Sequence, residues 1–264
     1  MNALRDFVSQ VSIVVSSCDS FFDAWRPFAF FFRKQWPDCP FAVHLITNHL
    51  DLRSDVIRAL RVGDDKGWAS NMQVALQQIA TPYILYFQED YFLTGRVDNE
   101  QLARDIEFAI AQNAAALSFF DLSALEPQPP TPNERYIPIP RESKGRTRLQ
   151  TTLWNSDALA SILVPGETAW DMEARGSRRT VEMPIFVYAR TAEAPIQYLM
   201  SGIVRSLWTP EARTLCRAHG LQIQPHFRSD LVHGKWRRRW ARAVTRTRYR
   251  IAFARQKGRP VEVA

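Results

Sequence analysis

The stretch YILYFQEDYFL, residues 83–93, decides how the rest of the sequence is interpreted. It begins with an apolar, aromatic run at residues 83–87 and then reaches two adjacent carboxylates, Glu89 and Asp90. A short, continuous apolar run is typical of a strand that is buried on both faces of a parallel sheet. Ligands of open α/β sheets bind where such strands end, so the sequence predicts a site at Glu89 and Asp90. The alternative is a solvated strand end with no ligand.

Strand-like and helix-like patterns alternate on both sides of this stretch. We expect further buried strands at residues 11–16, 40–47 and 115–120, and helices at residues 21–35, 52–60, 68–79 and 101–112. A strand is also expected at residues 146–152 and helices at residues 157–163 and 167–176. Strands that alternate with helices predict an α/β fold with a mostly parallel, Rossmann-like sheet flanked by helices.

Length and composition exclude several classes of protein. With 264 residues, 46% of them hydrophobic, the chain can bury a substantial core. It has no run of eighteen apolar residues, so we expect no membrane-spanning helix. The first ten residues lack the basic segment and apolar core of a signal peptide. The three cysteines are widely separated and form no CxxC motif, which favours reduced thiols in the cytosol and a packing role for Cys18.

The net charge of +7 is concentrated at the C-terminus. Residues 235–264 contain eleven Lys or Arg and one acidic residue, a net charge of +10, so residues 1–234 carry −3. We therefore divide the chain into a globular domain, 1–234, and a basic extension, 235–264.

The extension has a helical pattern of its own. Its Trp236, Trp240, Val244, Thr247 and Ile251 are spaced by four, four, three and four residues, which predicts an amphipathic basic helix over residues 235–256. Tryptophans on a basic helix favour an anionic membrane surface. The alternatives are a solvated terminus and contact with nucleic acid, of which we do not expect the second.

The segment GDDKGWASN, residues 63–71, predicts a short loop that leads into a helix N-terminus. Free backbone N–H groups at such an end favour anions. The segment lacks the spacing of a Walker loop or of GxGxxG, so a turn with a capped helix is the alternative.

Aromatic rings beside amides and carboxylates suggest a sugar site further along the chain. A ring can stack on the apolar face of a pyranose while polar groups bind its hydroxyls. The residues that we expect to contact a sugar acceptor are Gln150, Trp154, Asn155 and Trp170. Asp171 and Glu173 follow, and their spacing of two lets at most one of them face the same site. Alternatively, both tryptophans lie in the core and the carboxylates are charges at a helix start.

The order of these segments resembles that of GT-A-class glycosyltransferases, which use nucleotide-sugar donors. More narrowly, the chain is similar to bacterial enzymes of lipopolysaccharide, capsule or exopolysaccharide synthesis. The resemblance runs from about Val11 to Trp236. It is carried by VSIVVSSCDSFFDAW, RKQWPDCPFAVHLITN, GDDKGWASN, ILYFQEDYFL, LQTTLWN and PGETAWDMEARGS.

This resemblance implies roles by position. Donor binding would fall to Ser16, Cys18, Asp19, Gly67, Trp68, Asn71 and Glu89. Asp90 stands where the family has a DxD-type motif, although this sequence has QED, and it would bind Mn²⁺ or Mg²⁺ together with the late His233. Glu173 matches the catalytic base of inverting members, with Asp171 as the second candidate. Lys235, Arg178 and Arg179 are candidate phosphate partners.

The resemblance thus implies transfer of a sugar to a glycan or lipid-linked acceptor, by a cytoplasmic enzyme at the inner face of the plasma membrane. Nucleotidyl transfer is the alternative enzyme class, but it requires a glycine-rich start, and none of the ten glycines lies in the first 62 residues. A non-catalytic protein that binds sugar or nucleic acid is the remaining alternative.

Overall fold

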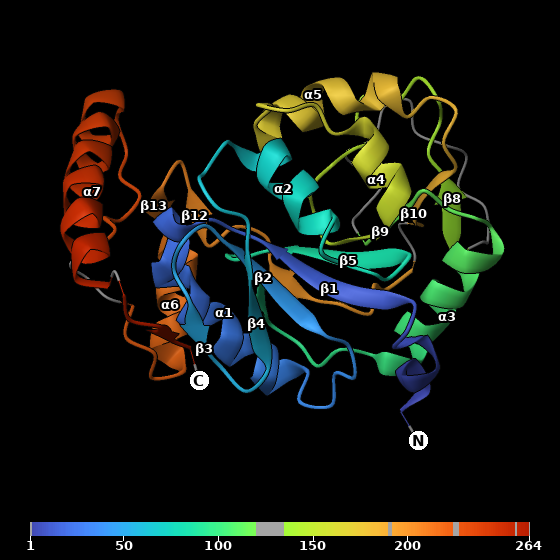
Figure 1. Cartoon of the computed structure of the whole chain (residues 1–264), viewed down its shortest axis with the longest axis horizontal. Coiled ribbons are helices and arrows are strands. Elements are labelled where there is room, and N and C mark those ends of the chain that lie inside the picture. The colour runs from blue at the N-terminus through green and yellow to red at the C-terminus, as the bar shows by residue number, and fades with distance from the viewer. Residues whose placement is uncertain (1, 120–134, 190–191, 224–226, 257, 264) are drawn as a thin grey trace.

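A computed structural model describes residues 2–119, 135–189, 192–223, 227–256 and 258–263. Within these residues the centre of the fold is an eight-stranded sheet with the order β4-β2-β1-β5-β9-β7-β10-β8 (Figure 1). Neighbours among β4, β2, β1 and β5 are parallel, whereas β9 is antiparallel to both β5 and β7. The strands are β1 (Val11–Ser16), β2 (Val43–Thr47), β4 (Ile57–Arg61), β5 (Tyr83–Gln88), β7 (Ala116–Ser118), β8 (Tyr136–Pro138), β9 (Thr152–Asn155) and β10 (Ile185–Tyr188).

Helices cover both faces of this sheet (Figure 1). One face carries α2 (Trp68–Leu76), α4 (Ser156–Ile162) and α5 (Ala169–Arg179). The other carries α1 (Phe22–Gln35), α3 (Asn99–Ala111) and α6 (Pro210–Ala218), with the short 3-10 helices η1 (Ala3–Phe7) and η2 (Asp19–Phe21). Each layer has its own hydrophobic cluster, and β1 supplies both: Ile13 and Val15 face one cluster while Val14 faces the other. Successive strand residues point to opposite faces, so a continuously apolar strand can lie in the centre of a sheet.

Three pairs of short strands surround the main sheet. They are β3 (Leu52–Arg53) with β14 (Val261–Glu262), β6 (Phe92–Leu93) with β11 (Tyr198–Leu199), and β12 (Ile203–Val204) with β13 (Leu207–Trp208).

The basic extension packs on the body through a few of its residues. It forms α7 (Lys235–Gln256), in which Ala241 and Thr245 are buried. The Thr245 hydroxyl accepts a hydrogen bond from the backbone N–H of Ser229 at 3.0 Å. After α7 the chain returns to the body, where β14 pairs in parallel with β3 and Val263 is buried. The division at residue 234 therefore does not separate two independent units.

The predicted fold class is confirmed: the protein has a largely parallel α/β sheet between helices, followed by a basic helix. Residues 11–16 form β1 and residues 235–256 form α7, as expected. Residue 120 of the expected strand at 115–120 lies outside the described residues.

Two predicted elements are wrong. Residues 52–60 were expected to be a helix, but they lie in β3 and β4, because β4 extends the sheet by pairing in parallel with β2. Residues 146–151, expected to be strand, instead direct backbone groups to α5: the N–H of Arg146 donates to Ser177 Oγ and that of Leu149 donates to Glu173.

Candidate active site

The candidate site lies where the parallel strands end. Ser16, the last residue of β1, pairs with Gln88, the last residue of β5, so the segments that follow both strands leave the same edge of the sheet. The backbone N–H of Glu89 donates to the carbonyl oxygen of Ser16 at 3.3 Å. The predicted donor-binding segment at residues 16–19 and the predicted carboxylates at residues 89–90 are therefore neighbours.

Asp19 holds two of the loops at this edge together. Its carboxylate accepts hydrogen bonds from the backbone N–H groups of Asn48, His49 and Leu50 at 2.8, 2.8 and 3.0 Å. The Asn48 side chain accepts in return from the N–H of Asp19 at 3.0 Å. Both oxygens of this buried carboxylate thus bind the protein itself, so Asp19 fixes the backbone of the predicted donor-binding segment.

The loop before α2 is held by its own polar residues. Asp65 Oδ1 accepts from the N–H of Gly67 at 3.1 Å and from Asn71 Nδ2 at 2.9 Å. Gly67 has a φ of +91°, a conformation that glycine adopts without strain. The indole of Trp68 donates to the hydroxyl of Tyr86 at 3.2 Å. Gly67, Trp68 and Asn71 therefore form a fixed turn at the predicted place, at the N-terminus of α2.

Cys18 faces the same region but is not activated as a nucleophile. Its Sγ lies 3.0 Å from the hydroxyl of Ser20. Burial, together with the negative charges of Asp65 and Glu89, raises the pKa of the thiol to about 12. The thiol therefore stays protonated at neutral pH, in line with the expected packing role.

Glu89 and Asp90 form a buried, poorly compensated pair. One oxygen of Asp90 accepts from the N–H of Ile203 at 2.8 Å, but the buried Oδ1 accepts no hydrogen bond from any residue that the structure describes. Burial raises the pKa of Asp90 to about 6. Burial and the neighbouring Asp90 raise the pKa of Glu89 well above its ordinary value. Two such carboxylates need a positive partner when both are ionised.

The residues present suit a divalent cation only in part. Mg²⁺ and Mn²⁺ prefer oxygen ligands and are commonly held by one or two carboxylates together with substrate phosphates, which the orphaned Asp90 Oδ1 and Glu89 match. His233 was expected to be a further ligand, but the structure does not place it with the two carboxylates. Among the described residues no three His, Cys, Asp or Glu side chains gather closely enough to bind a metal ion, and His233 is exposed just before α7.

Glu173 reaches this edge through the backbone of Leu149. The N–H of Leu149 donates to Glu173 Oε1 at 2.9 Å. The carbonyl oxygen of the same residue accepts from the Tyr91 hydroxyl at 3.0 Å and from Gln88 Nε2 at 3.2 Å. Burial is the main cause of the raised pKa of Tyr91, and the charge of Glu173 adds to it. One backbone segment therefore links the predicted base to the residues on either side of Glu89 and Asp90.

Asp171, the second candidate base, has a structural role instead. It forms a capping box at the start of α5. Asp171 Oδ2 accepts from the N–H of Thr168 at 3.1 Å, and Thr168 Oγ1 accepts from the N–H of Asp171 at 3.2 Å. The hydrogen bonds from Thr168 lower the pKa of Asp171, and Arg175 lies 3.5 Å away. Its carboxylate is therefore committed to the helix start.

Two of the four predicted acceptor residues are wrongly placed. Trp154 is fully buried in the core. Asn155 caps α4 and pairs with Tyr83, the first residue of β5, so it lies at the opposite end of that strand from Gln88. The cause is the direction of β9, which runs antiparallel to β5 and carries its end away from the site. Gln150 precedes β9 and lies at the correct edge, and Trp170 is 79% exposed on α5.

The three predicted phosphate partners lie in different surroundings. Arg179 donates to both oxygens of buried Glu167, at 3.0 and 2.7 Å, and so stabilises the body rather than a ligand. Arg178 is exposed on α5, and Lys235 is exposed at the start of α7.

We did not predict from the sequence that α7 approaches the site. Its Tyr249 packs beside the core, and burial together with the charges of Asp19 and Asp65 raises its pKa to about 12. Buried Arg228 was also missed; it pairs with Asp23 at 2.9 Å, and its charge offsets part of the pKa shifts of Glu89 and Asp90. The spacing of Ala241, Thr245 and Tyr249, four residues apart, is the one signal that could have indicated a docked helix face.

The fold and the site thus define an α/β protein with paired carboxylates at the carboxyl edge of its parallel strands. The structure is similar to residues 1–349 of TarS from S. aureus, with 15% identity, a TM-score of 0.49, and coverage of 94% of this chain and 74% of that one. Against a longer TarS structure it covers 43% of that chain, at 14% identity and a TM-score of 0.44.

It is also similar to a CMP:2-keto-3-deoxy-manno-octonic acid synthetase, with 10% identity, a TM-score of 0.48, and coverage of 80% of this chain and 98% of that one. No protein-family model matches the sequence, and no curated protein matches it. The function proposed below therefore rests on the site.

Proposed function

We propose that this protein transfers a sugar from a nucleotide-sugar donor to a glycan or lipid-linked acceptor, with inversion at the anomeric carbon. The observation that carries the proposal is the Leu149 link, which brings Glu173 to the strand end that holds Glu89 and Asp90. A site with a carboxylate base on one side and buried carboxylates on the other suits a reaction that removes a proton and expels a diphosphate.

Glu173 is the proposed base. The Leu149 N–H orients one of its oxygens, and the carboxylate takes the proton of the acceptor hydroxyl as that oxygen attacks the anomeric carbon. The bond between the anomeric carbon and the phosphate oxygen of the donor breaks, and the nucleoside diphosphate leaves.

The donor would lie over the loops that follow β1, β2 and β4, which Asp19 and Asp65 hold in place. Asp90, assisted by Glu89, would hold a divalent cation together with the donor phosphates. When bound, this cation would offset the charge that develops on the departing diphosphate.

The test compares Glu173→Gln with Asp171→Asn, two changes on the same helix. Glu173→Gln should lower kcat by about 10²–10⁴-fold, because it removes only the base, and it should leave the donor-induced thermal shift in place. Asp171→Asn should retain transfer. The measurement is release of nucleoside diphosphate across a panel of nucleotide sugars, with and without Mn²⁺.

Full transfer by Glu173→Gln, or loss of donor binding in that variant, would overturn the assignment of the base. Release of inorganic pyrophosphate from a nucleoside triphosphate and a sugar would identify a nucleotidyltransferase instead. Donor binding without turnover in the wild-type protein would favour the non-catalytic alternative.

We also propose that the outer face of α7 lies on an anionic membrane surface. Trp236 is 78% exposed and Trp240 is 72% exposed, and the surrounding helix is rich in arginine. Aromatic side chains on an exposed basic face suit the interface of an anionic bilayer. Within the described residues, none of the helices combines the length and the apolar composition that a membrane crossing requires.

A further inference from the structure

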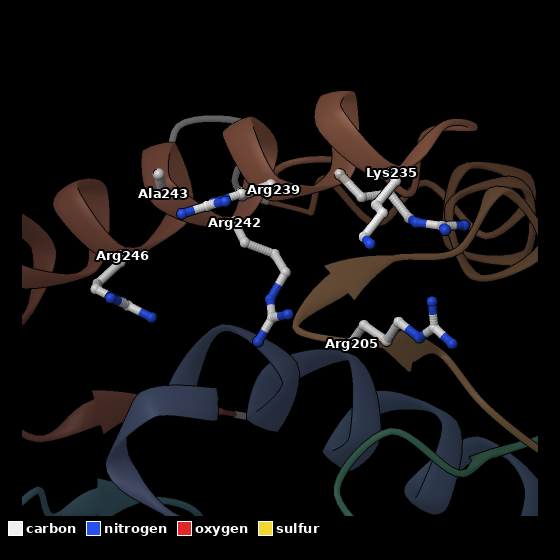
Figure 2. A pocket seen from close by; sticks show the side chains of 7 residues that line it. Arg205, Lys235, Arg239, Arg242, Ala243 and Arg246 are labelled. Atoms are coloured by element: carbon white, nitrogen blue, oxygen red, sulfur yellow. The ribbon is translucent and has the colours of Figure 1, made fainter.

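A basic groove separates α7 from the body. We use this name for the cavity of about 520 Å³ lined by Arg205, Lys235, Arg238, Arg239, Arg242, Ala243 and Arg246. Figure 2 shows Arg242 extending from α7 toward the body, with Arg205 on the β12–β13 hairpin across the gap. The volume falls in the range of sites that take small molecules.

The charges that line the groove have no acidic partner among the residues that the structure describes. Five arginines and one lysine line it, and in the described part of the chain none of these six side chains forms an ion pair with a carboxylate. Lys235–Arg239, Arg238–Arg242 and Arg242–Arg246 are each four residues apart on one helix, a spacing at which like charges repel. An arrangement that destabilises the free protein favours binding of an anion with several charges.

The groove also lies near the edge of the sheet where β1 and β5 end at Ser16 and Gln88, which we call the catalytic edge because the proposed reaction takes place there. A second cavity of about 180 Å³ shares Arg242 and Arg246 with it and is lined further by Ser20 and Tyr249, beside Asp19. The hairpin that carries Arg205 also contacts Asp90, since the N–H of Ile203 donates to the Asp90 carboxylate. Arg205 and Ser206 form its two-residue turn with φ of 52° and 64°, a strained conformation for residues other than glycine.

The exposed tryptophans indicate which anion reaches the groove. The Arg239 guanidinium, part of the groove, lies 5.9 Å from the ring centre of Trp236. The groove therefore opens beside the face of α7 that we assign to the membrane surface, while its other end approaches the catalytic edge. A ligand that spans the two carries its phosphate close to a lipid.

We propose that the basic groove binds the phosphate or diphosphate headgroup of a lipid-linked acceptor, and places the attached sugar toward Ser20 and the catalytic edge. This inference rests on the proposed function and deepens it by naming the chemical class of the acceptor. Guanidinium groups bind phosphate through paired, charge-assisted hydrogen bonds, which suits the five arginines.

The test measures binding to phosphatidylcholine vesicles that contain a polyprenyl diphosphate, against vesicles of the same surface charge made with phosphatidylglycerol. The groove variant is Arg239→Ala with Arg246→Ala. The matched control is Arg237→Ala with Arg248→Ala, which removes the same charge from α7 outside the groove. Wild type and control should prefer the diphosphate vesicles by about tenfold or more, and the groove variant should lose that preference.

Inorganic pyrophosphate should compete with the diphosphate vesicles. Equal loss of preference in the groove variant and its control would overturn the proposal, because it would show attraction by general surface charge. Stronger competition by a DNA oligonucleotide than by pyrophosphate, at equal phosphate concentration, would also overturn it and indicate a nucleic-acid site. The thermal shift of the wild-type protein with nucleotide sugars reports separately on the proposed function, so a failure of either proposal can be recognised.

Discussion

Burial in the fold changes the pKa of Asp90, the predicted metal ligand. It is buried, one of its oxygens has no hydrogen-bond partner among the described residues, and its pKa is raised to about 6 beside a second buried carboxyl group. A raised carboxyl pKa means that the folded state binds the proton more tightly than the unfolded chain does. The contribution of Asp90 to the free energy of unfolding therefore falls as the pH rises from about 4 through about 6.

Asp90→Asn should consequently stabilise the protein without metal. The amide oxygen can still accept from the Ile203 N–H, while the buried charge and its repulsion of Glu89 disappear. We expect the free energy of unfolding to rise by about 2 kcal/mol at about pH 8 and to change little at about pH 4.5. Denaturant unfolding at both pH values measures this change.

Mn²⁺ supplies the second half of this test. It should stabilise the wild-type protein at about pH 8, where the Asp90 carboxylate is ionised, and should not stabilise Asp90→Asn. Asp64→Asn is the control, because Asp64 is an exposed carboxylate on the neighbouring loop. Destabilisation of Asp90→Asn at about pH 8, or an equal response of both variants to Mn²⁺, would contradict the assignment.

At the scale of elements, the start of α5 determines where Glu173 points. Thr168 and Asp171 cap each other there, and the helix then carries Glu173 to Leu149. Thr168→Ala should lower the free energy of unfolding by about 1 kcal/mol, and it should leave transfer intact below the melting temperature.

A double-mutant cycle with Asp171→Asn checks that the two side chains act as one cap. Because each accepts a hydrogen bond from the other's backbone, their effects should sum to more than the loss in the double variant. Loss of transfer in the folded Asp171→Asn variant would show that Asp171, and not Glu173, serves the reaction.

The elements that the sequence predicted best are those whose pattern needs no partner to be recognised. The apolar run of β1 and the long period of α7 were correctly placed, because burial on two faces and a helical repeat are local properties. Residues 52–60 were mistaken for a helix because a short segment fits both periods, and only pairing with β2 decides between them.

In the candidate site, too, local patterns were predicted correctly and features that depend on strand pairing were not. Glu89 and Asp90 were found as carboxylates at a strand end, whereas Glu173 came from the resemblance, and the Leu149 link connects Glu173 to the segment that holds the other two. Trp154 and Asn155 failed because the sequence does not encode the direction of β9 in any local pattern. The capping role of Asp171 was visible as a threonine three residues before an aspartate, a spacing typical of helix starts.

For the molecule as a whole, the uneven charge acquires a position in space. The chain outside the extension carries −3 and includes the buried carboxylates, while α7 carries most of the excess positive charge. The structure docks this helix on the body beside the catalytic edge, with Ala241 and Thr245 buried (Figure 1). Removing the extension would therefore expose core residues, so the membrane proposal needs point substitutions rather than a truncation.

Trp236→Ser with Trp240→Ser tests which face of α7 meets the membrane. Both side chains point away from the docked face, so the fold should be unaffected, while affinity for anionic phosphatidylglycerol vesicles should fall by about tenfold or more. Trp170→Ser is the control, since Trp170 is equally exposed but lies on α5. Increasing salt should weaken the electrostatic part of wild-type binding, which co-sedimentation measures. Vesicle affinity that is unchanged by the double substitution would place the membrane contact on another face of the protein.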